Sequence, residues 1–450
     1  MRAAAAFSFA LLLVATGAEA ARVNVTLKLD PERRAGADAE GRVLLYTPRP
    51  FEPGSSVSHF DVSASPNLLM EPGVSSDLPP GEVDLTRAAM QDLGWRRGGF
   101  TASIEYTDPA GIGFDDPDLG AARRGAFEFA VARWARLLGS PVEVNIETRF
   151  RDFECSEAGG VLAAAGPNFA FIDIPGTDPG VWHTGPLAES LAGNDLSAGT
   201  SDGADLSVFF NQEIDNGCLG AGTSYYYGTD DGASSNEISF VTVAMHELGH
   251  GLGFTPLSDG VTGELFQGST DVFTRLIFDN RVGKSWDDLN DNQRRKSARR
   301  PQKVVLDGRR TTRAAADLLA GSDVLEVHRP RSVAGTYEVG SAVFGPPLTE
   351  AGVRGDLALV DDGSAQPTFG CDPLINAAEV AGKVALIDRG ECFFTVKVKN
   401  AQDAGAIAAV IIHNEPGAPP GLGGADPTIE IPSVRVGQKD GRKLKRRVQR

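Results

Sequence analysis

The stretch VAMHELGHGLGFTP, residues 243–256, places two histidines and a glutamate at a spacing that suits metal chemistry. On a helix, residues four apart share a face, so His246 and His250 can both offer a ring nitrogen to one cation. Two imidazoles with an open coordination position suit Zn²⁺, which lowers the pKa of a bound water to about 7. Glu247 projects beside them and can accept the proton of that water. The spacing therefore predicts a hydrolytic zinc site; the alternative is a pair of structural histidines.

Three glycines, Gly249, Gly251 and Gly253, crowd the end of this stretch. Each weakens a helix by up to about 1 kcal/mol, which predicts a helix that stops and turns just past His250. HELGHGLGF resembles the HExxHxxG pattern of the metzincin zinc endopeptidases, in which the glycine permits a sharp turn toward a third ligand three residues on. Here that position is Pro256, which has no ligand atom. The usual third ligand is therefore missing.

Five other side chains could supply the third ligand: His59, His183, His328, His413 and Asp259. The pattern around His413 predicts a strand end, and that around His328 predicts a linker. The pattern around His183 predicts a loop, in which the histidine is either in a substrate groove or simply exposed. Asp259 could replace a histidine on zinc, although PLSDG also predicts a turn in which the aspartate caps the backbone. The residue pattern alone leaves the choice open.

The segment around His59 resembles the lower half of a metzincin site. SHFDVSASPNLLMEPG, residues 58–73, places Met70 at a predicted tight turn, and VDLTRAAMQDLGW, residues 83–95, predicts a helix. In leishmanolysin and in bacterial relatives with a protease-associated (PA) domain, HExxHxxGF is followed by an insertion and then by a third histidine and a methionine turn. The resemblance implies that His59 is the third zinc ligand and that Met70 supports the metal from below without binding it. The alternative for Met70 is ordinary core packing.

The order of the segments departs from the family pattern. Residues 45–95 resemble the third-ligand segment, 100–320 the catalytic half, and 322–450 the PA insert, with GCDPLINAAEVAGKVALIDRGECFF as its clearest part. A circular permutation explains this order. It needs a join of about ten residues, which spans up to ~35 Å, whereas a domain of this size has a radius of gyration near ~16 Å. Alternatively, residues 45–95 form a surface tail remote from the zinc.

We therefore expect an α+β fold with a metzincin-like zinc protease domain and a mixed α/β PA domain. The expected parts are a signal peptide at 1–20, the permuted lower-half segment at 21–99, a catalytic half followed by a helical region at 100–320, and the PA domain at 322–450. Apolar periodicity predicts a helix over 121–138, and alternation predicts a strand over 141–150. Ser234 and Glu237 have the spacing of a capping box, which predicts that the HELGH helix starts near Ser234.

Composition and cysteine count favour an exported protein. The apolar run after Arg2 and the small residues Ala18 and Ala20 indicate a cleavable signal, and no later segment approaches the ~20 apolar residues of a membrane helix. The formal charge of -17 disfavours nucleic acid as a partner. An even count of four cysteines in an exported chain favours two disulfides, Cys155 with Cys218 and Cys371 with Cys392.

The expected function is that of a secreted zinc metalloendopeptidase that hydrolyses protein or peptide substrates. His246, His250 and His59 would bind Zn²⁺, and Glu247 would act as the general base. We expect no nucleic-acid partner and no membrane span; the sequence leaves the oligomeric state open. The alternative is a non-catalytic secreted binding protein with a degenerate protease half and a PA interaction domain.

Overall fold

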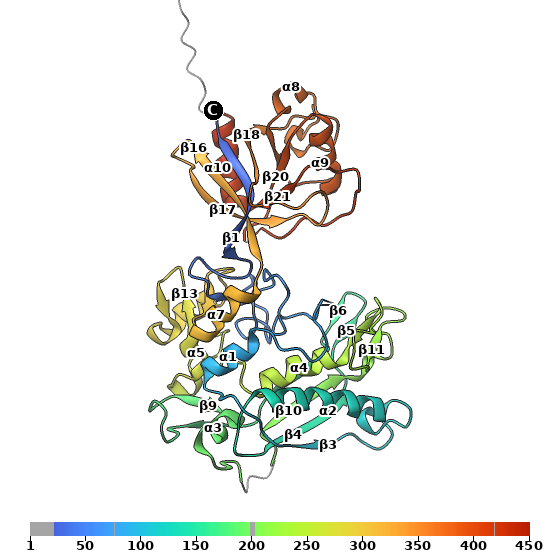
Figure 1. Cartoon of the computed structure of the whole chain (residues 1–450), viewed down its shortest axis with the longest axis vertical. Helices are drawn as coiled ribbons and strands as arrows, with labels where there is room; N and C mark the ends of the chain where they lie inside the picture. The colour runs from blue at the N-terminus through green and yellow to red at the C-terminus, as the bar shows by residue number, and fades with distance from the viewer. Residues whose placement is uncertain (1–21, 76, 199–202, 418) are drawn as a thin grey trace, which may run out of the picture. The chain divides into compact units, whose positions relative to one another are not determined.

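The computed structural model describes residues 22–75, 77–198, 203–417 and 419–450, which form two compact units, drawn in Figure 1. The large unit comprises Pro31–Ser322, and the barrel unit comprises residues 22–30 together with Asp323–Arg450. The predicted signal peptide, residues 1–20, lies outside the described residues. Among the residues that are described, no helix is long and apolar enough to cross a membrane.

The main sheet of the large unit has four strands in the order β3-β4-β10-β7. Their bounds are β3 Ala102–Tyr106, β4 Val144–Arg151, β7 Ala163–Pro167 and β10 Leu206–Asn211. Strands β3, β4 and β10 are parallel, and β7 pairs antiparallel with β10 at the edge of the sheet. The predicted alternation of β4 is confirmed, because Val144, Ile146 and Phe150 are buried.

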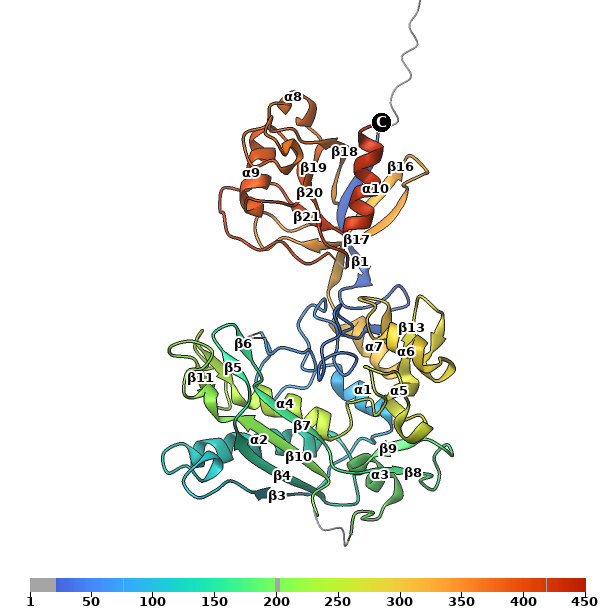
Figure 2. The same ribbon diagram turned by 180° about the vertical axis from the view of Figure 1, so that it is seen from behind.

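Two helices, α2 (Gly120–Leu137) and α4 (Phe240–Gly251), lie on one face of this sheet, as both views show (Figures 1 and 2). The apolar stripe predicted for α2 is confirmed, since Phe127 and Trp134 are fully buried. The indole Nε1 of Trp134 donates a hydrogen bond of 2.9 Å to the carbonyl of Met245 in α4. Packing and this hydrogen bond together fix α4 against α2.

Short elements fill the rest of the large unit. They are α3 Gly185–Ala192, β5 Cys155–Ser156, β6 Gly159–Gly160, β8 Ala170–Ile172, β9 Trp182–Thr184, β11 Ser224–Tyr226, β12 Glu237–Ser239, α5 Val272–Leu276, β13 Ile277–Asp279, β14 Lys284–Ser285, α6 Asp291–Ser297, β15 Val304–Leu306 and α7 Arg309–Leu318. The region after the HELGH helix was expected to be mainly helical. It instead alternates short helices with strands, because apolar runs such as 304–306 pair within a sheet of order β14-β13-β15-β2, in which β2 is Val43–Leu44.

Residues 43–95 are built into the large unit. Strand β2 (Val43–Leu44) pairs with β15, and helix α1 (Thr86–Leu93) contacts α7. The carboxylate of Asp92 in α1 accepts the backbone N–H groups of Arg310 and Thr311 at 2.9 and 2.8 Å, which caps the first turn of α7. Most buried apolar side chains of this segment belong to the core cluster of the large unit. This segment is therefore part of the core and is not a surface tail.

The barrel unit is a closed seven-stranded barrel in the order β1-β16-β17-β21-β20-β19-β18. The strands are β1 Asn24–Arg34, β16 Gly321–Arg329, β17 Gly335–Ser341, β18 Val353–Leu359, β19 Val384–Asp388, β20 Ala408–Ile412 and β21 Ser433–Val436, and the helices are α8 Ala377–Val380, α9 Phe394–Asp403 and α10 Gln438–Val448. Strands β18, β19, β20 and β21 are parallel neighbours. The βα alternation expected after residue 322 is present.

The N-terminal strand completes the barrel, which differs from the expected boundaries. Residues 21–99 were expected to form one segment of the protease, but Val25 and Leu27 are fully buried in the barrel core. Strand β1 pairs antiparallel with β18, with Asn24 opposite Asp356. Alternating apolar residues at the start of the chain therefore join a sheet whose other strands come from residues beyond 320.

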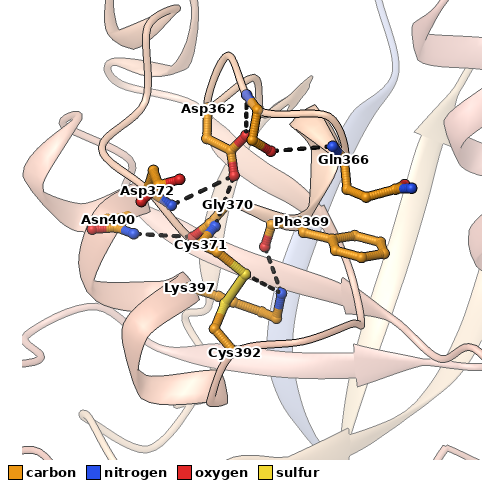
Figure 3. The surroundings of a disulfide bond; sticks show 10 residues. Asp362, Gln366, Phe369, Gly370, Cys371, Asp372, Cys392, Lys397 and Asn400 are labelled. Carbon is orange, nitrogen blue, oxygen red and sulfur yellow. Dashed lines mark hydrogen bonds between the residues drawn. A yellow bond between two sulfur atoms is a disulfide. The ribbon is translucent and has the colours of Figure 1, made fainter.

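Both predicted disulfides are confirmed. Cys155 bonds Cys218 in the large unit, and Cys371 bonds Cys392 in the barrel unit. Figure 3 shows the second bond with its neighbours. The ammonium of Lys397, whose side chain is fully buried, donates to the carbonyl of Phe369 at 2.6 Å and lies 3.5 Å from the sulfur of Cys371. The disulfide and this lysine together hold the loop before α9.

Candidate metal centre

Helix α4 presents the HELGH residues and begins later than the sequence suggested. Ser239 caps it, since its hydroxyl accepts the backbone N–H of Thr242 at 3.2 Å. The predicted start at Ser234 is wrong. Glu237 does accept the N–H of Ser234 at 2.9 Å, but residues 237–239 form strand β12, which pairs with β11 and stays extended. Because residues 237–239 pair as a strand, the helix begins only at Phe240.

The glycines at the end of α4 allow neighbouring segments to approach closely. A Cβ atom at Gly249 would lie 2.7 Å from the sulfur of Met70, and one at Gly251 would lie 2.9 Å from the side chain of Leu206. The helix ends at Gly251, and Gly253 follows with a φ of 116°. The predicted stop and turn are confirmed. The side chain of Met70, fully buried, packs directly against the turn of α4 that carries the two histidines.

His59 is brought to this helix by backbone pairing on both sides. The carbonyl of His59 accepts the N–H of Tyr46 at 2.8 Å, and the N–H of Phe60 donates to the carbonyl of Met70 at 2.8 Å. The ring of Phe60 packs edge-on against Phe254, with centroids 5.0 Å apart. The segment that carries His59 is thereby fixed to the residues just beyond the end of α4.

The three imidazoles converge on one point. The Nε2 atoms of His59, His246 and His250 form a triangle with all three separations at 3.1 Å. All three residues are buried. Among the described residues, this trio is the one group of His, Cys, Asp and Glu side chains placed to hold a metal ion together.

Backbone carbonyls fix the tautomer of each ring. The Nδ1 atoms of His246 and His250 lie 2.7 Å and 2.8 Å from the carbonyl oxygens of Leu69 and Phe254, and Nδ1 of His59 lies 2.8 Å from the carbonyl oxygen of Ser55. A carbonyl oxygen can only accept, so each Nδ1 carries the hydrogen. Each Nε2 of a neutral ring then has a lone pair and no proton, and the three lone pairs face one another.

The surroundings favour the neutral form of all three rings. Burial lowers the pKa of His246 to about 4. Burial and, secondarily, His246 lower the pKa of His250 to about 3. For His59, burial and then the two neighbouring histidines hold the pKa well below its usual value. At neutral pH the site therefore has no proton to place between the Nε2 atoms, and three converging lone pairs need a cation.

The geometry fits a tetrahedral zinc ion. Zinc–nitrogen bonds of about 2.0–2.1 Å separate two tetrahedral ligand atoms by about 3.3 Å. The observed Nε2 separations of 3.1 Å are close to this value. Metal-binding histidines commonly donate their second N–H to a carbonyl or carboxylate, and all three rings here do so. Three protein ligands leave one position open, as in catalytic zinc sites.

Glu247 lies beside the triad in a cavity of about 450 Å³. Its side chain is buried, and burial raises its pKa to about 8. The same cavity is lined by the three histidines and, along one side, by Ala163, Ala164 and Ala165 of the edge strand β7. The cavity therefore joins three converging imidazoles, a carboxyl group and the edge strand of a sheet, an arrangement that can hold an extended peptide.

The other residues proposed for the third position lie elsewhere. Asp259 accepts the backbone N–H of Val261 at 2.6 Å, which is the turn that PLSDG predicts. His183 is buried in β9 with Nδ1 3.1 Å from the carbonyl of Val181. His328 contacts Thr26 in the barrel unit, and His413 contacts Arg389 there. None of these belongs to the group that can share a metal ion.

Sequence reasoning missed the groups that orient the histidines. The carbonyl oxygens of Ser55, Leu69 and Phe254 have no signature in residue type, because every residue carries a carbonyl. The place of the edge strand β7 beside Glu247 depends on the order of strands in the sheet, because residues 163–167 are far from the HELGH residues in the sequence.

Comparison with known proteins identifies one domain. Residues 353–444 match the PA domain family. The PRADC1-like protein of Drosophila melanogaster is 36% identical over 104 residues, which is 23% of this chain and 50% of that protein. Leucine aminopeptidase 2 of Trichophyton equinum is 41% identical over 76 residues, 17% of this chain and 15% of that protein. ER degradation-enhancing alpha-mannosidase-like protein 3 of Homo sapiens is 41% identical over 80 residues, 18% of this chain and 8% of that protein.

A zinc aminopeptidase from Bacillus subtilis is a solved structure with 28% identity, covering 25% of this chain and 26% of that one, at a TM-score of 0.20. That score is too low to extend the likeness beyond the matched part. The chain spans half or less of the length of these curated relatives. The protein is thus a mixed α/β chain that contains a PA domain, and aminopeptidases are among the proteins it resembles.

Proposed function

We propose that this chain is a secreted zinc metalloendopeptidase of metzincin type. The observation that carries the proposal is the convergence of three Nε2 atoms 3.1 Å apart, each on a ring whose Nδ1 is bonded to a backbone carbonyl. His59, His246 and His250 would hold the ion. A bound Zn²⁺ supplies Lewis acidity, which makes water a stronger acid and polarises a peptide carbonyl.

Glu247 moves the proton in this mechanism. Its carboxylate takes a proton from the attacking water and returns it to the nitrogen of the leaving amine. In the metal-free protein, burial raises the pKa of Glu247 to about 8, so the group is protonated at neutral pH. A divalent cation held by the histidines favours the ionised carboxylate, because a nearby opposite charge lowers a carboxyl pKa. Metal binding would therefore also lower the pKa of Glu247 and favour the carboxylate that acts as the base.

The edge strand β7 would align the substrate. Its outer edge has backbone groups that β10 does not use, and three of its alanines line the cavity with Glu247. An extended peptide can add to such an edge through backbone hydrogen bonds, which need no particular side chain. The scissile bond would then lie across the histidine triad. This placement supports cleavage within a chain.

We further propose that the chain is a circularly permuted metzincin. In support, residues 43–95 supply His59, Met70 and helix α1 to the core that holds α4. The join between Trp95 and strand β3 takes only residues 96–101. The folded arrangement needs the ligands close in space and does not depend on their order along the chain. Secretion is proposed from the signal-like leader and the two disulfides.

Hydrolysis of a blocked peptide tests the proposal. An internally quenched peptide that is acetylated at one end and amidated at the other cannot serve an aminopeptidase, so its cleavage establishes endopeptidase action. We expect cleavage that is abolished by a zinc chelator and restored by Zn²⁺. Cleavage that starts only from a free amino terminus would reassign the activity to an aminopeptidase, and zinc binding without cleavage of either substrate would favour the non-catalytic binding protein.

A further inference from the structure

A second cluster of functional side chains lies in the barrel unit, at the carboxyl ends of three neighbouring parallel strands. Arg389 directly follows β19, His413 directly follows β20, and Arg435 lies in β21. Side chains alternate between the two faces of a strand, so these three share the face of Ile387 and Ile411. That face packs against α9. We name Arg389, His413 and Arg435 the carboxyl-edge cluster.

The hydrogen bonds of Arg389 determine what His413 can bind. Nη1 of Arg389 donates to Nδ1 of His413 at 3.2 Å and to the side-chain oxygen of Asn414 at 2.8 Å. A guanidinium can only donate, so Nδ1 of His413 accepts and the hydrogen of the neutral ring is on Nε2. Burial, together with the two arginines, lowers the pKa of His413, which favours the neutral ring. His413 thus offers one N–H donor.

Arg435 is buried with an unsatisfied donor. The residue is 4% exposed, its Nη2 donates to the carbonyl of Gly421 at 2.7 Å, and its guanidinium stacks on the ring of Phe394 at 4.4 Å. Its Nε–H, however, is buried without a hydrogen-bond partner. An unsatisfied donor on a buried cation is costly, and such groups usually face a ligand or an ordered water.

The local charge favours a ligand with a single negative charge. Burial and, secondarily, the nearby charge of Arg389 lower the pKa of Arg435 to about 10. The acid next to them is Glu415, whose side chain is 65% exposed and pairs with Arg389 at 3.3 Å. Two cations and one anion leave an excess of one positive charge. The N-terminus of α9, at Phe394, has no side-chain cap and adds positive potential beside Arg435.

We propose that the carboxyl-edge cluster binds a carboxylate, specifically the C-terminal carboxylate of a peptide. Guanidinium groups match the planar, two-oxygen shape of a carboxylate, and ligands of parallel sheets bind at the carboxyl ends of the strands. The choice of a carboxylate comes from the cluster itself. The choice of a peptide as its source rests on the proposed function, since hydrolysis of a peptide bond creates a new C-terminal carboxylate.

Calorimetric titration of the full chain tests this site. The chain carries Glu247→Gln, so that the peptide is not consumed, and the probe is acetylated tetra-alanine with a free carboxyl terminus. Three further probes are the same peptide amidated, an amidated peptide with one internal glutamate, and inorganic phosphate. We expect the free acid to bind at least about tenfold more tightly than its amide, as for a charge-assisted hydrogen bond.

Two substitutions locate the binding. Arg435→Met should weaken binding of the free acid by about tenfold or more, and Arg389→Gln, at a partly exposed position, should do the same without disturbing the core. Arg442→Met removes an exposed arginine from α10 of the same unit and should change the affinity by less than about twofold. Melting curves of each variant check the fold.

The outcomes separate the parts of the proposal. Equal binding of acid and amide, tighter binding of phosphate, or unchanged affinity in both Arg435→Met and Arg389→Gln would overturn it. Binding of the internal glutamate peptide but not of the free acid would overturn the C-terminal assignment and retain the carboxylate. Binding of the free acid by a chain that cleaves no peptide would support the site and reject only the proposed function.

Discussion

The two units use buried histidines in opposite ways. In the large unit, Nδ1 of His246 and His250 donates to backbone carbonyls, so the Nε2 atoms are left as lone pairs that need a cation. In the barrel unit, Nδ1 of His413 accepts from Arg389, so its Nε2 is left as a donor that suits an anion. Burial lowers the pKa of all three, so burial does not distinguish them. The hydrogen-bond partner of Nδ1 therefore determines whether Nε2 suits a cation or an anion.

Substitution of Glu247 has the largest expected effect on the large unit. Glu247→Gln keeps the shape of the side chain and removes the base, so peptide hydrolysis should fall by about 10²–10⁴-fold. Zinc content should stay unchanged, because Glu247 is not a member of the histidine triad. Steady-state kinetics and metal analysis of the same preparation measure both quantities.

An exposed glutamate in the following loop, Glu264, provides the control for that experiment. Glu264→Gln should retain full activity. Undiminished hydrolysis in Glu247→Gln would remove the general base from the mechanism and would leave the histidine triad as a structural metal site.

Removal of one histidine from each unit separates the two kinds of site. His59→Ala removes one of the three proposed zinc ligands, so zinc affinity should fall by about 100-fold or more, beyond the roughly 10–100-fold cost of losing an outer partner. His413→Ala should leave zinc affinity unchanged. A competition titration with a chromophoric chelator measures both zinc affinities. Equal affinities in the two variants would contradict the assignment of zinc binding to His59 and not to His413.

Acid should destabilise the metal-free large unit through the triad. The folded pKa of His250 is lowered to about 3, whereas an unfolded histidine titrates near 6.5, so between these values the unfolded state binds more protons. Stability therefore falls as the pH drops from about 6.5 toward 3. The glutamine variant His250→Gln lacks this titration. In the metal-free state its free energy of unfolding, relative to that of wild type, should therefore be about 2 kcal/mol higher at pH 4.5 than at pH 7. Urea unfolding in the presence of a chelator measures this shift, and a pH-independent difference would contradict the neutral triad.

Two glycine substitutions test the packing beneath the proposed zinc site. Gly249→Ala places a Cβ 2.7 Å from the sulfur of Met70, so it should destabilise the protein by about 1–2 kcal/mol. Gly125→Ala lies inside α2 with nothing within 4 Å of the added atom and should stabilise by up to about 1 kcal/mol. Thermal unfolding compares the two. If both substitutions changed the stability in the same direction, the side chain of Met70 would move aside at little cost and would not support α4.

Local spacing predicted part of the site. The four-residue interval of His246 and His250 requires only that the segment be helical, and the glycines around Gly253 indicated where it turns. The start of the helix was misplaced because the pairing of β12 with β11 overrides the capping pattern of Ser234. His59 was predicted as the third ligand only from the resemblance to a family, since nothing near it in the sequence indicates that it lies beside α4.

Long-range pairing explains what the sequence did not predict. Strand β1 enters the barrel through partners more than 300 residues away, such as Asp356 opposite Asn24. The carboxyl-edge cluster depends on the register of three strands, which places Arg435 opposite Ile411. The cysteine pairs were predictable because each joins residues of one compact unit. Alternation identifies a strand, but only the folded sheet shows which side chains meet.

X-ray absorption at the zinc K-edge tests the proposed three-histidine site, because it counts the imidazoles around the ion in the wild-type chain. We predict three imidazole nitrogens at about 2.0–2.1 Å with one oxygen ligand, and two imidazoles in His59→Ala. A wild-type spectrum with two imidazoles, or one unchanged by the substitution of His59, would contradict a site assembled from both the start of the chain and helix α4.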